Sequence, residues 1–183
     1  MRGYVWLDEE IRGGGGSGGD MFPPLRVSAD TSQLEYRSKS GSRAAIRISR
    51  IVSETVGLVG RDPRVRWLVM GDDDTVFIPE NLVTALRKFD HREMYYIGST
   101  SESHLQNVAH FSYNMAYGGG GFAISYPLAL ALHAMQDGCL ARYPALIGSD
   151  DRIQACVAEL GVPLTRHPGF HQVTIQFSKC FPY

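Results

Sequence analysis

The sequence predicts a single α/β domain with a largely parallel sheet flanked by helices. Short apolar segments of four or five residues alternate with longer segments whose apolar residues recur at helical spacing. The apolar run Trp67–Met70 ends at Gly71, and three carboxylates follow directly. This pattern is typical of a buried strand whose carboxyl end reaches the surface of such a sheet. The length of 183 residues suits one domain, and a hydrophobic content of 44% is enough for a core.

The N-terminal third is predicted to contain one strand and one helix. Tyr4–Leu7 is a short apolar strand, and the glycine-rich segment 13–19 (GGGGSGG) is a flexible linker or a surface insertion. Residues 28–42, rich in Ser, Arg and Lys, are predicted to form a loop. Apolar residues three or four positions apart predict a helix over Ala44 to Val59, which Asp62-Pro63 ends.

The central part supplies three predicted strands and one helix. Arg66–Met70, Tyr95–Gly98 and Phe122–Ser125 are strands, and Pro79 begins a helix at its first position. The segment 104–113 fits neither pattern. Ligands in sheets of this kind bind beyond the carboxyl ends of the strands, which is where the three aspartates fall.

Two helices and a loop complete the predicted order. Tyr126–Met135 has the composition of a helix, and Ser149 is predicted to cap a second helix from Asp150 to Leu160. Gly161 ends that helix, and residues 167–172 form a loop.

The strongest chemical signal is the triplet Asp72, Asp73 and Asp74. Carboxylates crowded at a strand end repel one another and lose hydration if partly buried. A divalent cation removes both penalties, because Mg²⁺ and Mn²⁺ take hard carboxylate oxygens as ligands. The Asp-x-Asp pattern therefore predicts a metal site that holds a diphosphate. The simpler interpretation is a solvated acidic turn. An EF-hand loop is disfavoured, because Val76 and Phe77 stand where it needs a carboxylate or amide and a glycine.

The glycine segment Tyr117–Ser125 (YGGGGFAIS) is the second signal. Its glycines allow backbone to pass close to a ligand and leave N–H groups unshielded. The segment matches the G-x-G-x-x-A form of a dinucleotide fingerprint, but the glycines lead into a predicted strand rather than a helix, so we discount that match. A mobile linker is the alternative, and the apolar residues that follow favour an ordered loop.

Two further features offer catalytic or ligating groups. Asp150 and Asp151 lie in the first turn of a predicted helix, where they either complement the helix dipole or serve as a general base toward a hydroxyl. His171 lies in a Gly/Pro loop (PGFHQ), where it is either an exposed side chain or the nitrogen ligand of an oxygen-rich metal site.

Composition excludes several other functions. The formal net charge of −1 carries no electrostatic footprint for nucleic acid, and no apolar stretch approaches the ~20 residues of a membrane span. Cys139, Cys156 and Cys180 form no C-x-x-C pair, which disfavours a zinc thiolate site or a redox dithiol. If one disulfide forms, we expect it between Cys139 and Cys156.

Taken in order, these segments resemble a known enzyme family. The series WLVMGDDDTVF, YYIGS, YNMAYGGGGFAIS, GSDDRIQACVAELGV and PGFHQ is similar to the Fringe-like glycosyltransferases of family 31. It is most similar to their plant branch, whose members carry a domain of unknown function. The resemblance runs from about Gly3 to Gln172, with 13–19 as an insert. It implies a GT-A-like (Rossmann-like) fold in a partial domain over 1–172, followed by a divergent tail over 173–183.

The resemblance also assigns roles to residues. It implies that Asp72, Asp74 and His171 hold Mn²⁺, with Mg²⁺ as the alternative ion. It places the UDP-sugar donor against Asp72, Asp73 and the glycines Gly119, Gly120 and Gly121. Asp151, or with less support Asp150, matches the catalytic base. The implied reaction is an inverting transfer of a hexose from the UDP-sugar to a hydroxyl of a glycan or glycoprotein acceptor.

The resemblance further implies residence in the Golgi lumen as a type II membrane protein. Relative to the family pattern, the chain is expected to lack the membrane anchor and the first nucleotide-binding unit, so the fold is expected to be incomplete. Two alternatives therefore stand beside the glycosyltransferase: a non-catalytic fragment of such an enzyme and, more distantly, a Mg²⁺-dependent phosphohydrolase that would share the acid cluster.

Overall fold

The structure is a computed structural model that describes residues 2–10, 23–109 and 111–172. The glycine-rich segment 13–19 and the tail 173–183 lie outside the described residues. Within the described part, no helix is both long enough and apolar enough to cross a membrane.

The main sheet contains four strands in the order β3-β5-β4-β6. Their bounds are β3 Trp67–Met70, β4 Tyr96–Gly98, β5 Phe122–Ser125 and β6 Leu164–Arg166. Strands β3, β4 and β6 point the same way, whereas β5 runs antiparallel to both of its neighbours. The expected α/β class is confirmed, and β5 makes the sheet a mixed one.

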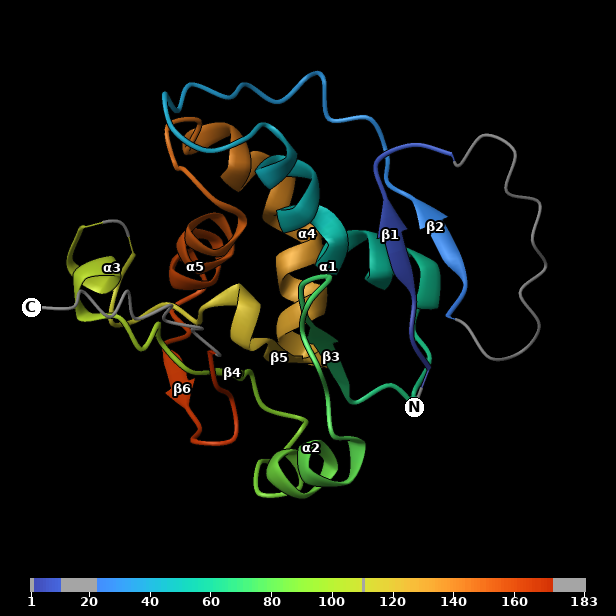
Figure 1. Cartoon of the computed structure of the whole chain (residues 1–183). Coiled ribbons are helices and arrows are strands. Elements are labelled where there is room, and N and C mark those ends of the chain that lie inside the picture. Colours follow the sequence, from blue (N-terminus) through green and yellow to red (C-terminus); the bar gives the residue numbers. More distant parts are fainter. Residues whose placement is uncertain (1, 11–22, 110, 173–183) are drawn as a thin grey trace, which may run out of the picture.

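Five α-helices accompany the strands in the described residues (Figure 1). Their bounds are α1 Ala44–Val59, α2 Pro79–Leu86, α3 His104–Ala109, α4 Tyr126–Arg142 and α5 Ser149–Glu159. The helix expected from Tyr126 to Met135 is thus longer, and the undecided segment 104–113 begins with a short helix.

The sheet is covered on both faces, and the alternation of side chains along each strand shows how. In β5, Phe122 and Ile124 point into the core beneath α1, α4 and α5, whereas Ala123 points into the core beneath α2. In β4, Tyr96 joins the first core and Ile97 the second. Because both faces are buried, these strands are apolar at nearly every position, which explains why they are short continuous apolar runs in the sequence.

Helices α1, α4 and α5 pack against one another to form the larger layer. Cys139 of α4 is joined to Cys156 of α5 by a disulfide, which confirms the expected pairing. Two buried polar groups also link α1 and α4: the Gln136 amide donates a 2.6 Å hydrogen bond to the Ser49 carbonyl, and the Ser53 hydroxyl bonds the Gln136 oxygen.

The sequence patterns missed two strands, β2 (Leu25–Val27) and β6 (Leu164–Arg166). Strand β1 (Val5–Leu7) was expected, but it pairs in parallel with an unexpected strand β2 (Leu25–Val27) in a separate two-stranded sheet. Strand β6 was not predicted either. Strand β2 is exposed at all three positions and no residue of β6 is buried, so neither shows the apolar run that marks the buried strands.

The prediction that Ser149 caps α5 is wrong. The helix begins at Ser149, Gly148 holds the capping position, and no side chain of that residue caps the helix. Asp151 instead accepts hydrogen bonds from the N–H groups of the two residues that precede the helix, Ile147 (2.8 Å) and Gly148 (3.0 Å).

The segments with candidate functional residues all lie along one side of the sheet, at the ends of its four strands. Met70 pairs with Phe122, Phe122 with Gly98, and Gly98 with Arg166, so the four strands reach this edge in one row. The acid triplet follows β3, and the loop containing His171 follows β6. Since β5 runs the other way, it is the amino end of this strand, with the glycines before it, that lies at the same edge.

Candidate functional site

The acid triplet forms a tight turn directly after β3. Asp72 N–H donates to the Thr75 hydroxyl (2.7 Å), and Thr75 N–H donates back to the Asp72 carbonyl (3.1 Å). Each of Asp72, Asp73 and Asp74 offers a carboxylate oxygen within 4.8 Å of the others, and all three side chains are exposed. Hard oxygens at this spacing suit Mg²⁺ or Mn²⁺, so the residues present fit the predicted ion.

The glycines form an ordered turn rather than a mobile linker. Gly118–Gly120 make one 3₁₀ turn that leads into β5, which confirms that the glycines precede a strand. The turn contacts the acid loop, because the Thr75 hydroxyl donates to the Gly119 carbonyl (3.2 Å). Gly121 has a φ of 71°, a backbone conformation that favours glycine, and a Cβ there would lie 2.9 Å from the Phe77 ring.

Asp150 faces the glycine turn from the start of α5. Its Oδ2 accepts a 2.8 Å hydrogen bond from Gly118 N–H, and its Oδ1 accepts one of 3.1 Å from the Ser149 hydroxyl. Burial raises the pKa of the Asp150 carboxyl, while the Gly118 and Ser149 hydrogen bonds oppose that rise. The negative charges of Asp151 and Asp72 raise it further.

Tyr117 lies among the same acids. Burial raises the pKa of its phenol, and the charges of Asp150, Asp74 and Asp72 raise it further. The carboxylates of the acid loop and of α5 thus both act on the same phenol.

Asp151 is directed elsewhere. Both of its carboxylate oxygens accept backbone N–H groups of the turn that precedes α5. The two adjacent acids therefore have different surroundings, one toward the glycine turn and one toward the backbone of its own helix start.

His171 sits on the loop after β6, held by the segment after β4. The side chain of its neighbour Gln172 accepts hydrogen bonds from the Ser101 hydroxyl (2.7 Å) and from Glu102 N–H (3.1 Å). The His171 Nδ1 lies 3.6 Å from Glu102 Oε1. His171 is exposed, and its backbone carbonyl would lie 3.1 Å from a Cβ at Gly120, so this loop passes close to the glycine turn.

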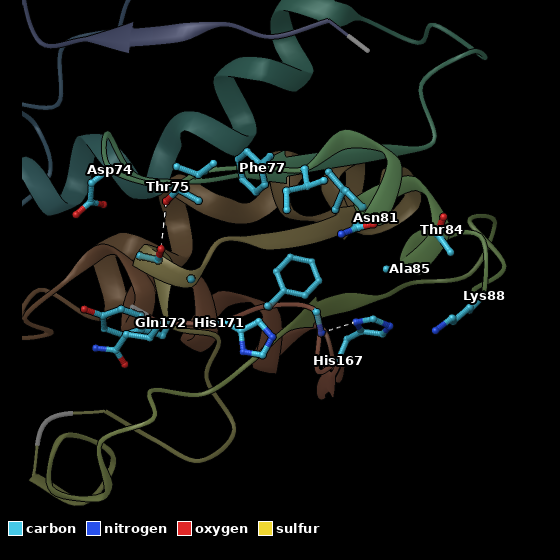
Figure 2. A pocket seen from close by; sticks show the side chains of 18 residues that line it. Asp74, Thr75, Phe77, Asn81, Thr84, Ala85, Lys88, His167, His171 and Gln172 are labelled. Carbon is cyan, nitrogen blue, oxygen red and sulfur yellow. Dashed lines mark hydrogen bonds between the residues drawn. The ribbon is translucent and has the colours of Figure 1, made fainter. Parts of the chain in front are cut away.

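A cavity of about 640 Å³ joins three of these segments (Figure 2). Among the predicted site residues, Asp74, Gly119, Gly120 and His171 line it. The other predicted residues lie outside the lining: Asp72, Asp73, Gly121, Asp150 and Asp151.

The sequence patterns missed the opposite wall of this cavity. Val76, Phe77 and Ile78 directly follow the acid turn, helix α2 adds Asn81, and Lys88 follows the end of that helix. Val76 is 87% exposed and Ile78 58%, although both are apolar. The sequence signal for this wall is the apolar run Val76–Ile78 directly after the three acids.

The comparisons with known proteins connect this chain with glycosyltransferases. Residues 106–179 match the model of a family described as "Protein of unknown function, DUF604". The chain is 30% identical over 109 residues to the human protein named "Beta-1,3-glucosyltransferase", and 29% identical over 109 residues to the mouse protein of the same name. Each alignment covers 60% of this chain and 21% of the relative. The chain thus spans about a fifth of the length of the curated relatives it matches.

Proposed function

We propose that this chain is the donor- and metal-binding part of an inverting glycosyltransferase that uses a UDP-sugar. The observation that carries the proposal is the meeting of the acid turn, the glycine turn and the His171 loop around one cavity. The similarity to proteins named for glucosyl transfer supports the same reaction class.

The acid turn and the cavity determine how a donor would be held. Asp74 lines the cavity and belongs to the carboxylate cluster, so it is the best candidate for direct metal contact, with Asp72 second. His171 lines the same cavity and would add a nitrogen. A bound Mn²⁺, or Mg²⁺, would offset the negative charge that develops on the departing UDP. Gly119 and Gly120 leave room for the sugar, because a side chain there would meet Tyr117 or the His171 backbone.

The base is proposed to be Asp150. The resemblance favours Asp151, but the contacts of Asp151 are those of a helix cap. Asp150 faces Gly118, and its raised pKa makes its carboxylate a stronger proton acceptor. In this role it takes the proton of the acceptor hydroxyl, whose oxygen attacks the anomeric carbon opposite the UDP and inverts it.

Calorimetric titration with UDP, with and without Mn²⁺, tests the proposal. Binding is expected only with the metal, and Asp74→Ala should abolish it, because that change removes a carboxylate from both the cluster and the cavity. Glu9→Ala is the matched control, since it removes an exposed carboxylate outside the cavity. A folded chain that binds no UDP would support the non-catalytic alternative. Phosphate release from simple esters would instead favour the phosphohydrolase.

The acceptor and the cellular location follow from the same proposal. A glycan or glycoprotein hydroxyl is the proposed acceptor, and the Golgi lumen is the proposed location. Both stay predictions until transfer and targeting are measured with the natural protein.

A further inference from the structure

The cavity is charged oppositely at its two ends. Figure 2 shows Asp74 at one end and Lys88 at the other, with His167 near the lysine end. The proposed donor site occupies the Asp74 end, so the end formed by α2 has no assigned ligand. Two further residues of the lining, Val76 and Ile78, form an apolar wall that is exposed to solvent.

The α2 end presents hydrogen-bond donors and a positive charge. The His167 Nδ1 accepts a 3.0 Å hydrogen bond from Gly169 N–H, so a neutral imidazole carries its proton on Nε2. Burial lowers the pKa of His167, and the nearby Lys88 charge lowers it further, which favours that neutral donor form. Lys88 adds an ammonium group with three donors, and Asn81 adds an amide.

We propose that the α2 end binds the acceptor, and that the acceptor carries an acidic sugar whose carboxylate contacts Lys88. This inference rests on the proposed function, because it places the second reactant in the cavity that would hold the donor. The apolar wall at Val76 and Ile78 contacts the apolar face of the acceptor or its aglycone. The ligand is thus matched to the cavity: it is negative where Lys88 lies, apolar where it meets Val76 and Ile78, and open to Asp74 at the reacting end.

Two glycosides that differ only at C6, a carboxylate in one and a hydroxymethyl group in the other, test this assignment. The affinities of 4-nitrophenyl glucuronide and 4-nitrophenyl glucoside are measured by ligand-observed NMR, with and without Mn²⁺ and UDP. The glucuronide is expected to bind about two- to fivefold more tightly, the size of one solvated ion pair. Lys88→Gln should remove that preference and leave the glucoside affinity unchanged.

Matched variants separate charge from fold and from the apolar wall. Lys39→Gln makes the same change at an exposed loop lysine outside the cavity and should keep the preference. Val76→Ser should weaken both glycosides equally, because it changes the wall and not the charge.

Three results would overturn the assignment. These are equal affinities in the unmodified chain, a preference that survives Lys88→Gln, or a Lys88→Gln effect on UDP-glucuronate instead, which would place the acidic sugar on the donor. If the chain binds no UDP in the presence of Mn²⁺ but still prefers the glucuronide, the proposed function is wrong and the acidic-sugar site is supported on its own.

Discussion

At the scale of single residues, neighbouring acids in this chain do different work. Asp150 and Asp151 are adjacent in the sequence, yet one accepts Gly118 N–H and the other accepts the backbone before its own helix. A helix turns by about 100° per residue, so consecutive side chains cannot share one environment. The division between a candidate base and a cap follows from that rotation.

The first prediction separates these two roles by transfer activity. Asp150→Asn should keep Mn²⁺–UDP binding and lower the rate of sugar transfer by ~10²–10⁴-fold, because the amide cannot take the acceptor proton. Asp151→Asn should keep most of the transfer rate. The measurement is the initial rate of transfer at saturating donor. If Asp150→Asn is fully active and Asp151→Asn is not, the base is Asp151.

The second prediction concerns stability and pH in metal-free buffer. Burial raises the pKa of Asp150, so its ionised form is disfavoured in the folded chain. The folded state therefore binds this proton more tightly than the unfolded state, and its contribution to stability is lost as pH rises through the folded pKa. Asp150→Asn should accordingly melt at a higher temperature than the unmodified chain at pH 7. The difference should shrink as the pH falls toward the ordinary value of 3.8. A lower melting temperature at pH 7 would show that the hydrogen bonds outweigh the burial.

At the scale of elements, strand β5 builds the candidate site. It is antiparallel to β3 and β4, so its amino end lies beside their carboxyl ends. The glycine turn is fixed there by Tyr117 N–H, which donates to the Ser99 carbonyl after β4 (2.9 Å). A parallel β5 would have carried the glycines to the opposite edge of the sheet, away from the aspartates.

The third prediction tests the packing of this turn against α5. A Cβ at Gly118 would lie 2.5 Å from Asp150 Oδ1, so Gly118→Ala should displace the carboxylate and reduce both stability and transfer. Gly57→Ala is the matched control. Among the described residues, no atom lies within 4 Å of a Cβ there, and Gly57 is inside α1, so stability should rise by about 0.5–1 kcal/mol. Denaturant unfolding measures the free energy of unfolding of both variants. An unchanged value for Gly118→Ala would mean that the glycine turn can shift to accommodate the methyl group.

At the scale of the whole molecule, the site depends on how the two layers are held on the sheet. Helix α5 carries the candidate base, and the disulfide between Cys139 and Cys156 joins it to α4. The buried Arg152 adds to this support, since it donates to the carbonyls of Tyr143 (2.7 Å) and Leu146 in the segment before α5. The orientation of Asp150 is therefore set by contacts remote from the cavity.

The fourth prediction is the stability that the disulfide supplies. Replacing Cys139 and Cys156 together by alanine should lower the free energy of unfolding by about 3 kcal/mol, as expected for a loop with a sequence separation of 17. Urea unfolding under non-reducing conditions measures it. Cys180→Ala, which leaves the bridge intact, is the control. An unchanged midpoint in the double variant would mean that the bridge contributes nothing in solution.

Local chemistry was enough to predict much of this protein from the sequence. The four strands and four helices with clear patterns, the acid triplet at a strand end and the ordered glycine turn all depend on neighbours in the chain. The boundaries were less accurate: α4 continues to Arg142, and the cap of α5 comes from Asp151 rather than Ser149. Helix ends depend on which side chain reaches the free N–H groups, and more than one candidate was near.

The sequence by itself determined the class of fold, the types of its elements and the residues able to hold a metal. Tertiary structure alone decided that β5 lies antiparallel between β3 and β4, that Asp150 rather than Asp151 faces the glycines, and that α2 closes the cavity opposite His171. The physical reason is that side-chain periodicity specifies which face of an element is buried, whereas its partner and direction depend on packing between segments far apart in the chain.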